Sequence, residues 1–134
     1  MTGKVRRRLR PKSLPEGADR EVGYAFGVQV GDTVWVSGQV AKNERNELVG
    51  ADDPAAQAEQ CFRNVAAILA EAGGTLADVV QLNIFIKDRS YSAPVQQVRK
   101  RLFEDPDYPT AIMIVGEAIR PEYLVEIQAV AVLG

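Results

Sequence analysis

The chain has 134 residues, of which 46% are hydrophobic and 25% charged, and its formal net charge is −2. This length and composition indicate one globular domain with a hydrophobic core and argue against a disordered chain. Because the sequence contains no histidine, it excludes Ser/His and Cys/His nucleophiles and histidine-containing zinc sites, so acid–base chemistry falls to Glu, Asp, Tyr, Lys or bound water.

Two further features bear on the cellular compartment. No apolar run approaches the ~18 residues that cross a bilayer, and the first residues lack the apolar core of a signal peptide. We therefore expect a cytoplasmic protein without a membrane partner. The single cysteine, Cys61, excludes an internal disulfide, and its place on an apolar helical stripe predicts a core residue rather than a reactive thiol.

Positive charge is concentrated at the start of the chain. Six of the 16 basic residues lie in residues 1–12, which contain no acid. With Pro11, Pro15 and Gly17 in the same region, we expect residues 1–20 to form a basic extended arm and residues 21–134 a single domain. Such an arm can contact RNA phosphates, but no aromatic residues alternate with its charges. A solvated arm, or one packed on a neighbouring subunit, is the simpler interpretation.

After the arm, apolar–polar alternation and helical spacing predict the element order ββαβαββ. The five strands are expected at residues 23–30, 33–39, 79–87, 110–118 and 123–133. The two helices are expected between capping and terminating signals, from Asp53-Pro54 to Gly73-Gly74 and from Ser90 or Ser92 to Asp105-Pro106. This order predicts an α+β fold in which two helices cover one face of a single mixed sheet.

Glu126 is the first candidate for a functional residue. It lies in the middle of the last predicted strand, which is otherwise mostly apolar. A carboxylate buried there without partners costs several kcal/mol, so it must be hydrogen-bonded, solvated in a cleft or protonated. The alternative is an edge strand whose second face is wet.

Gly38 is the second unusual strand position. A glycine inside Ser37-Gly38-Gln39 marks either a β-bulge or a place where another group approaches the backbone closely. The simpler alternative is an ordinary strand end.

The second face of the sheet has a mixed character. The alternation assigns to it apolar residues, which are Trp35, Val79, Phe85, Met113, Val115, Val130 and Val132. It also assigns polar residues, which are Ser37, Gln39, Gln81, Asn83, Glu126 and Gln128. Such a surface is typical of a subunit interface that contains a cleft, so we expect a homo-oligomer.

Several landmarks of the sequence occur together in one known family. They are Tyr24, Gly31-Asp32, the segment from Val34 to Gln39, Glu71-Ala72-Gly73, the segment from Phe85 to Asp88, Tyr108-Pro109, and the segment from Val125 to Ala131. With this order and spacing, the chain from about residue 23 onward resembles the Rid family (reactive intermediate deaminase, also called YjgF-like).

The resemblance implies a chorismate-mutase-like fold that forms a homotrimer with clefts between subunits. Members of the deaminase type hydrolyse enamines and imines such as 2-aminoacrylate to 2-keto acids and ammonia, without a metal or cofactor. It further implies that Glu126 positions the attacking water and that Tyr24, Ser37 and Gly38 line the pocket. Gln39 and Gln128 are additional candidates for substrate binding.

One family position departs from the pattern. The arginine that holds the substrate carboxylate in the family falls on Ala111 here. Loss of such a contact weakens binding of a 2-imino acid by about 10- to 150-fold, and we expect a ligand that depends less on a carboxylate. Arg120 is not expected to replace the arginine from the same strand, because nine strand residues span roughly 30 Å. Arg89, Arg101 or the arm remain as sources of a cation.

Three hypotheses follow. The leading one is a trimeric enzyme that hydrolyses or tautomerises a small imine- or enamine-like metabolite, with Glu126 as base. The alternative is a non-catalytic trimer that binds a metabolite and acts in regulation. The third is RNA binding or ribonuclease-like activity through the basic arm, although no clustered acids accompany it.

Overall fold

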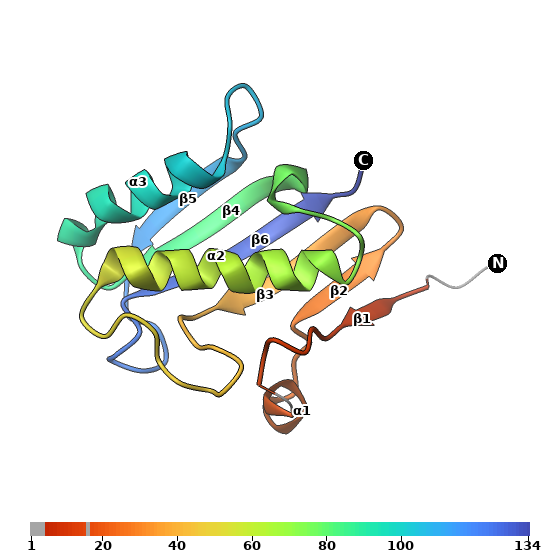
Figure 1. The fold of residues 1–134 in the computed structure, drawn as a ribbon, viewed down its shortest axis with the longest axis horizontal. Coiled ribbons are helices and arrows are strands. Elements are labelled where there is room, and N and C mark those ends of the chain that lie inside the picture. Colours follow the sequence, from red (N-terminus) through yellow and green to blue (C-terminus); the bar gives the residue numbers. More distant parts are fainter. Residues whose placement is uncertain (1–4, 16) are drawn as a thin grey trace.

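The computed structural model describes residues 5–15 and 17–134, and Figure 1 shows their arrangement. In this part of the chain, six strands form one mixed sheet in the order β1-β2-β3-β6-β4-β5. Its strands are β1 (Arg7–Leu9), β2 (Gly27–Val30), β3 (Thr33–Gln39), β4 (Val79–Ile86), β5 (Thr110–Val115) and β6 (Val125–Val132). The helices are α1 (Ala18–Val22), α2 (Pro54–Ala70) and α3 (Ser92–Leu102), with short 3-10 helices at Leu76–Asp78 and Arg89–Tyr91.

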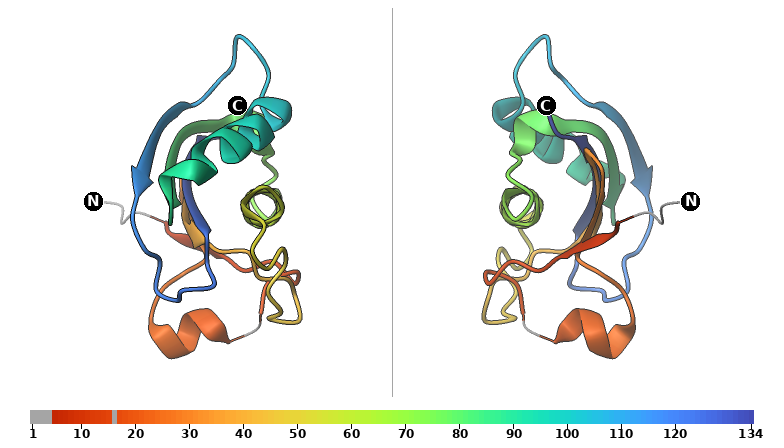
Figure 2. Two further views of the ribbon diagram at one scale, coloured as in Figure 1. Left: turned by 90° about the vertical axis from the view of Figure 1, so that its left-hand side faces the viewer. Right: turned by 90° about the vertical axis from the view of Figure 1, so that its right-hand side faces the viewer.

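The two long helices lie on the same face of the sheet (Figure 2). From Gly27 onward the elements follow the predicted order ββαβαββ, which confirms the α+β fold. Helix α2 begins as expected: the Asp53 side chain accepts a hydrogen bond from the Ala56 N–H, and Pro54 is the first helical residue. The predicted serine caps of α3 were wrong, because Asp88 caps the preceding 3-10 helix and Tyr91 precedes α3 without a side-chain cap.

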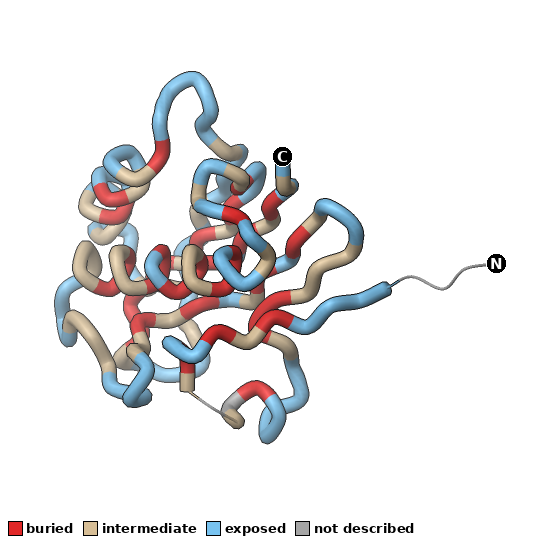
Figure 3. The backbone as a smooth tube through the Cα atoms, turned by 45° about the vertical axis from the view of Figure 1, so that its right-hand side comes forward, coloured by how far each residue is buried: buried red, intermediate tan, exposed pale blue. Residues whose placement is uncertain are grey.

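The core lies between α2 and the centre of the sheet, as the buried residues in Figure 3 show. Strand β6 is paired on both sides, with β3 and with β4. Its residues Val125, Ile127, Ala129 and Ala131 are buried. Cys61 on α2 is also buried, its thiol donates to the Val125 carbonyl at 3.7 Å, and burial raises its pKa, so the prediction of a core cysteine is confirmed.

The open face of the sheet carries exposed apolar side chains. Three apolar residues that the sequence assigned to this face lie on the helix face instead. Met113 and Val115 pair with Ile84 and Ile86, so they lie on the helix face. An irregularity in the β4–β6 ladder between Val79 and Gln81 moves Val79 to the helix face as well. The open face of β5 instead carries Ile112 and Ile114, which are 53% and 41% exposed.

The N-terminal segment is partly folded onto the body. Within the expected arm, Arg7–Leu9 pairs with β2 as an edge strand, and Leu9 is buried in the core. Helix α1 crosses the predicted boundary at residue 20. Residues 1–4 of the arm lie outside the described residues. Among the described residues, no helix is long and apolar enough to cross a membrane.

Candidate functional site

Strand β3 contains a bulge at Gly38. Val36 pairs with Ala129 and Gln39 pairs with Ile127, so three steps along β3 match two steps along β6. Ser37 and Gly38 therefore share the space opposite one residue of β6. This confirms the prediction that Gly38 marks a β-bulge. The extra residue also turns Gln39 toward the interior, where it is 5% exposed, instead of leaving it on the open face.

Glu126 on β6 lies directly against this bulge. A Cβ atom built on Gly38 would be 3.0 Å from the carboxylate carbon of Glu126 and 3.2 Å from each of its oxygens. The close approach proposed for Gly38 is thus also confirmed. Only a residue without a side chain leaves the carboxylate its present position.

The environment of Glu126 raises its pKa. The residue is half-buried, and burial is the cause of the shift. Within the described part of the chain, no guanidinium or ammonium forms an ion pair with its carboxylate, and no donor is within hydrogen-bond distance. Glu126 is therefore neither in open solvent nor paired with a cation of the described residues, and its carboxylate accepts a proton more readily than that of an ordinary glutamate.

A cleft of about 740 Å³ opens in front of Glu126. It brings together most of the residues that the sequence pointed to, namely Tyr24, Ser37, Gly38, Gln39 and Glu126. Their side chains come from β3, β6 and the segment between α1 and β2. We call this cavity the Glu126 cleft.

Hydrogen bonds and ring contacts hold these side chains in place. The Ser37 hydroxyl donates to the Ala25 carbonyl, so its oxygen is left as an acceptor toward the cleft. The Gln39 amide donates to the Ser37 carbonyl at 3.1 Å. The Tyr24 ring meets Phe26 edge to face, with centroids 5.8 Å apart. Burial raises the pKa of Tyr24, and the charges of Asp19 and Glu126 add to the effect, so its hydroxyl keeps its proton.

Two predicted residues lie outside the Glu126 cleft. Gln128 accepts a hydrogen bond from Asn83 at 3.1 Å and lines a second cavity, described below. Ala111 pairs with Leu82 on β4, so within one chain it lies on the helix face and on the far side of β4 from β6. It lines a separate cavity together with Arg99 and Lys100 of α3.

Sequence reasoning missed several residues of the cleft, among them Lys42, Arg120 and Tyr123. The exclusion of Arg120 was wrong, because β5 ends at Val115 and the following loop brings Arg120 back to the cleft. The Lys42 ammonium lies 5.8 Å from the centre of the Tyr123 ring. These residues lie in loops, where no periodic pattern marks which side chains converge.

Gln57 on α2 holds the loop that leads into β6. Its side-chain oxygen accepts from the Leu124 N–H at 2.8 Å. Its amide donates to the carbonyls of Glu122 at 3.0 Å and Gly50 at 3.2 Å. Since Gln57 is fully buried, these bonds fix the start of β6 and thereby the position of Glu126.

Comparison with known proteins places this chain in a family. Residues 17–133 match the family model described as Endoribonuclease L-PSP. The chain belongs to this family. Its members include the Rid or YjgF proteins, so the resemblance seen in the sequence is confirmed.

Relatives of this Endoribonuclease L-PSP family member cover nearly the whole chain. A protein of Dermatophagoides farinae named 2-iminobutanoate/2-iminopropanoate deaminase is 35% identical over 82% of this chain and 85% of its own length. The crystal structure of RidA from the Antarctic bacterium Psychrobacter is 32% identical, with a TM-score of 0.84 over 95% of this chain and 99% of that one. The Mycobacterium tuberculosis member of the YjgF/YER057c/UK114 family is 31% identical, with a TM-score of 0.78 over 96% of this chain and 100% of that one.

Proposed function

We propose that this protein hydrolyses a small imine or enamine to a carbonyl compound and ammonia in the Glu126 cleft. The observation that carries the proposal is the half-buried Glu126 carboxylate, which lies against Gly38 in a cleft of about 740 Å³ and forms no ion pair with any described residue. Similarity to a relative named as an imine deaminase supports the reaction class. A tautomerisation by the same carboxylate is the closest variant of this chemistry.

The proposed steps use one water molecule and one base. Glu126 takes a proton from water while the water oxygen bonds to the imine carbon, and the C=N electron pair moves to nitrogen. The protonated Glu126 then returns the proton to that nitrogen, which gives a carbinolamine. Glu126 next takes the proton of the new hydroxyl group and passes it to the nitrogen as the carbon–nitrogen bond breaks, so ammonia leaves and the carbonyl forms. The raised pKa of Glu126 suits these transfers, since it lies closer to neutral pH than that of an ordinary glutamate.

The Tyr24 and Ser37 side chains serve as positioning groups in this proposal. The Tyr24 hydroxyl keeps its proton and can donate to the substrate, whereas the Ser37 oxygen can accept a hydrogen bond from water or from the imine N–H. The side-chain amide of Gln39 holds the backbone of Ser37 in place by donating to the Ser37 carbonyl.

We also propose that the protein is a homotrimer and that a neighbouring subunit closes the Glu126 cleft. The exposed apolar residues Trp35, Ile112 and Ile114 on the open face support an interface there. A neighbouring chain is also what would bring the Ala111 cavity to the Glu126 cleft, because the two lie apart within one chain. Light scattering coupled to size-exclusion chromatography measures the mass, and a monomer at micromolar concentration contradicts this assembly.

The second candidate function is binding of a metabolite without catalysis. It is favoured because no described residue forms an ion pair with Glu126, so the orientation of an anionic substrate is left to other groups of the cleft. The two functions differ in whether turnover depends on the carboxylate.

The experiment measures ammonia released from freshly generated 2-iminobutanoate, corrected for the spontaneous reaction. Glu126→Gln is compared with Glu117→Gln, which removes an exposed acid from the loop after β5. We expect Glu126→Gln to lower kcat about 10²- to 10⁴-fold, as loss of a general base does, and Glu117→Gln to leave it unchanged. Equal rates in the two variants contradict the catalytic role, and an inactive wild type with retained ligand binding favours the second candidate.

A further inference from the structure

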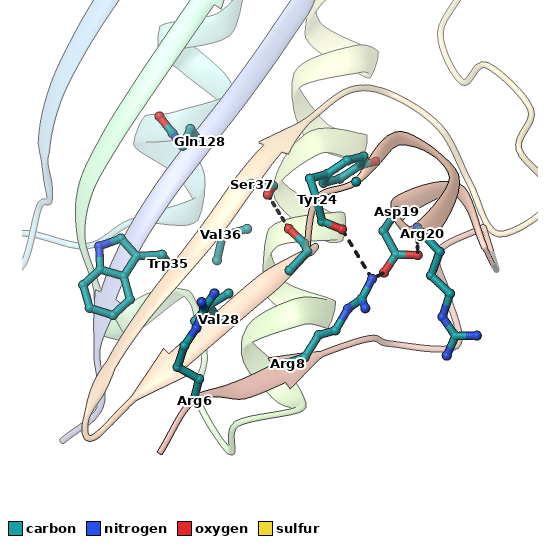
Figure 4. Close-up of a pocket in the computed structure, with 12 residues that line it drawn as sticks. Arg6, Arg8, Asp19, Arg20, Tyr24, Val28, Trp35, Val36, Ser37 and Gln128 are labelled. Carbon is teal, nitrogen blue, oxygen red and sulfur yellow. Dashed lines mark hydrogen bonds and ion pairs between the residues drawn. The ribbon is translucent and has the colours of Figure 1, made fainter. Parts of the chain in front are cut away.

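A second cavity, of about 680 Å³, lies on the open face of the sheet beside the Glu126 cleft (Figure 4). Val28 and Trp35 form its apolar wall. Its charged wall comes from the N-terminal segment and α1, and consists of Arg6, Arg8, Asp19 and Arg20. Tyr24 and Ser37 line both this cavity and the Glu126 cleft. The charged wall is therefore next to the two side chains to which we assign a positioning role.

The backbone of Tyr24 is bound to residues of this charged wall. Its N–H donates to the backbone carbonyl of Asp19 at 3.0 Å, and the N–H of Gly23 donates to the same carbonyl at 2.9 Å. The carbonyl of Tyr24 accepts a hydrogen bond from the Arg8 guanidinium at 3.3 Å. Both backbone polar groups of Tyr24 are thus held by Asp19 and Arg8.

The Asp19 carboxylate joins these two supports. It is inaccessible to solvent, and it pairs with Arg8 at 2.6 Å and with Arg10 at 3.1 Å. In Figure 4 the same nitrogen of Arg8, Nη2, donates to Asp19 and to the Tyr24 carbonyl. A buried carboxylate is costly unless it is paired. Asp19 therefore holds Arg8 in a position from which its guanidinium also reaches Tyr24.

Strand β3 holds the other side of the segment that contains Tyr24. The Ser37 hydroxyl donates to the Ala25 carbonyl, and the Ser37 N–H donates to the Phe26 carbonyl at 2.9 Å. Strand β1, which carries Arg8, is itself anchored by Leu9 in the core. Residues 24–26 therefore lie between two fixed supports, and loss of either one lets Tyr24 move relative to Glu126.

We propose that Arg8 and Asp19 are positioning residues of the Glu126 cleft, which hold Tyr24 where its hydroxyl reaches a substrate bound at Glu126. The inference rests on the proposed function and gives the N-terminal segment a part in the site. Arg10 has a different place in the cluster: among the described residues it pairs with Asp19 but makes no hydrogen bond to Tyr24. A misplaced positioning group lowers the rate steeply, by about 100-fold for 1 Å.

The test compares Arg8→Met with Arg10→Met. Each substitution keeps a long apolar side chain and removes one positive charge and one ion pair with Asp19, but only Arg8→Met removes the bond to the Tyr24 carbonyl. We expect Arg8→Met to lower kcat/KM for 2-iminobutanoate about 10-fold or more and Arg10→Met to have a smaller effect. Circular dichroism checks that both variants are folded under the assay conditions. Equal losses in the two variants overturn the proposal.

A double-mutant cycle with Tyr24→Phe tests whether Arg8 acts through Tyr24. Tyr24→Phe should itself lower kcat/KM, because it removes the hydroxyl. Arg8→Met should then add little to it, since the group that Arg8 places is already gone. A merely structural role of Arg8 would instead lower kcat/KM by the same factor in both backgrounds, and that result contradicts the positioning role.

Amide hydrogen exchange measured by NMR tests the same contacts without turnover. In Arg8→Met the N–H groups of Gly23 and Tyr24 should exchange about 10-fold faster or more, as loss of one charged hydrogen bond allows, while the amides of β6 keep their protection. Unchanged exchange at Tyr24 overturns the positioning role. A wild type that does not hydrolyse the imine contradicts the proposed function alone, and the exchange at Tyr24 then still supports or overturns the hold of Arg8 and Asp19 on its backbone.

Discussion

The carboxylate of Glu126 occupies the space that a side chain on residue 38 would fill, since a Cβ there would be 3.0 Å from its carbon. The bulge in β3 brings the backbone of Gly38 to this position, and α2 fixes the start of β6 through Gln57. The position of the proposed base therefore depends on an absent side chain and on a helix residue remote in sequence.

Gly38→Ala tests this relationship. The added methyl group would contact the end of a flexible side chain and not the backbone, so the fold should survive while the carboxylate moves by a few tenths of an ångström. A misplacement of this kind lowers kcat by about 10-fold or more. Steady-state hydrolysis and a thermal melt measure both effects, and Gly116→Ala, at a glycine with open space around it, is the control. Unchanged kcat in Gly38→Ala would show that Glu126 tolerates displacement.

Glu126→Gln should make the protein more stable at neutral pH. The pKa of Glu126 is raised above 4.5 by burial, so its contribution to stability is fully present below pH 4.5 and is lost as the pH rises through the raised pKa. Glutamine cannot ionise and avoids this loss. We expect a higher Tm for Glu126→Gln than for the wild type at pH 7, and a smaller difference at pH 4. A lower Tm of the variant at pH 7 is the opposite result.

Gln57→Ala should destabilise the fold by about 2–4 kcal/mol, because it leaves one buried N–H and two carbonyls without their partner. The three bonds concerned join α2 to residues Gly50, Glu122 and Leu124. Urea unfolding measures the loss, and Gln96→Ala, at an exposed position on α3, controls for removal of a helical glutamine. A loss below about 1 kcal/mol would mean that water replaces these bonds.

Much of this fold follows from local patterns in the sequence. The Asp53-Pro54 start of α2 and the apolar face of β6 both have direct signals, a cap and a strict alternation. The β-bulges in β3 and β4 have no such signal in the sequence. Each bulge shifts a residue to the other face of the sheet, which is why the predicted faces of Gln39 and Val79 were wrong. Edge strand β1 was missed because Leu9 is one apolar residue among arginines, and its pairing with β2 is a tertiary contact.

The residues of the candidate site also divide into those with a local signal in the sequence and those without one. Glu126 and Gly38 were identifiable because each breaks the expected strand composition. Arg120 and Lys42 lie in loops whose return to the cleft depends on where β5 and β3 end, and the sequence overestimated the length of β5. The burial of Asp19 and its pairing with Arg8 depend on the fold of the N-terminal segment.

Asp19→Asn should release the N-terminal segment. Burial alone would raise the pKa of Asp19, but the hydrogen bond from Arg8 and the charges of Arg10 and Arg8 outweigh it and lower the pKa below 3.8. Its contribution to stability is therefore present above pH 3.8 and is lost as the pH falls through the lowered pKa. The amide removes this contribution at pH 7, so trypsin should cleave after Arg7 and Arg8 faster than in the wild type. Asp52→Asn, at an exposed loop acid, is the control.

The dependence of kcat/KM on pH tests the role of Glu126 most directly. With 2-iminobutanoate as substrate and the spontaneous reaction subtracted, the wild-type rate should fall on the acid side with a midpoint above 4.5, where Glu126 takes up its proton. Glu126→Gln should be slow at every pH and lack this acid limb. An acid limb that persists unchanged in Glu126→Gln would assign the base to another group and contradict the account.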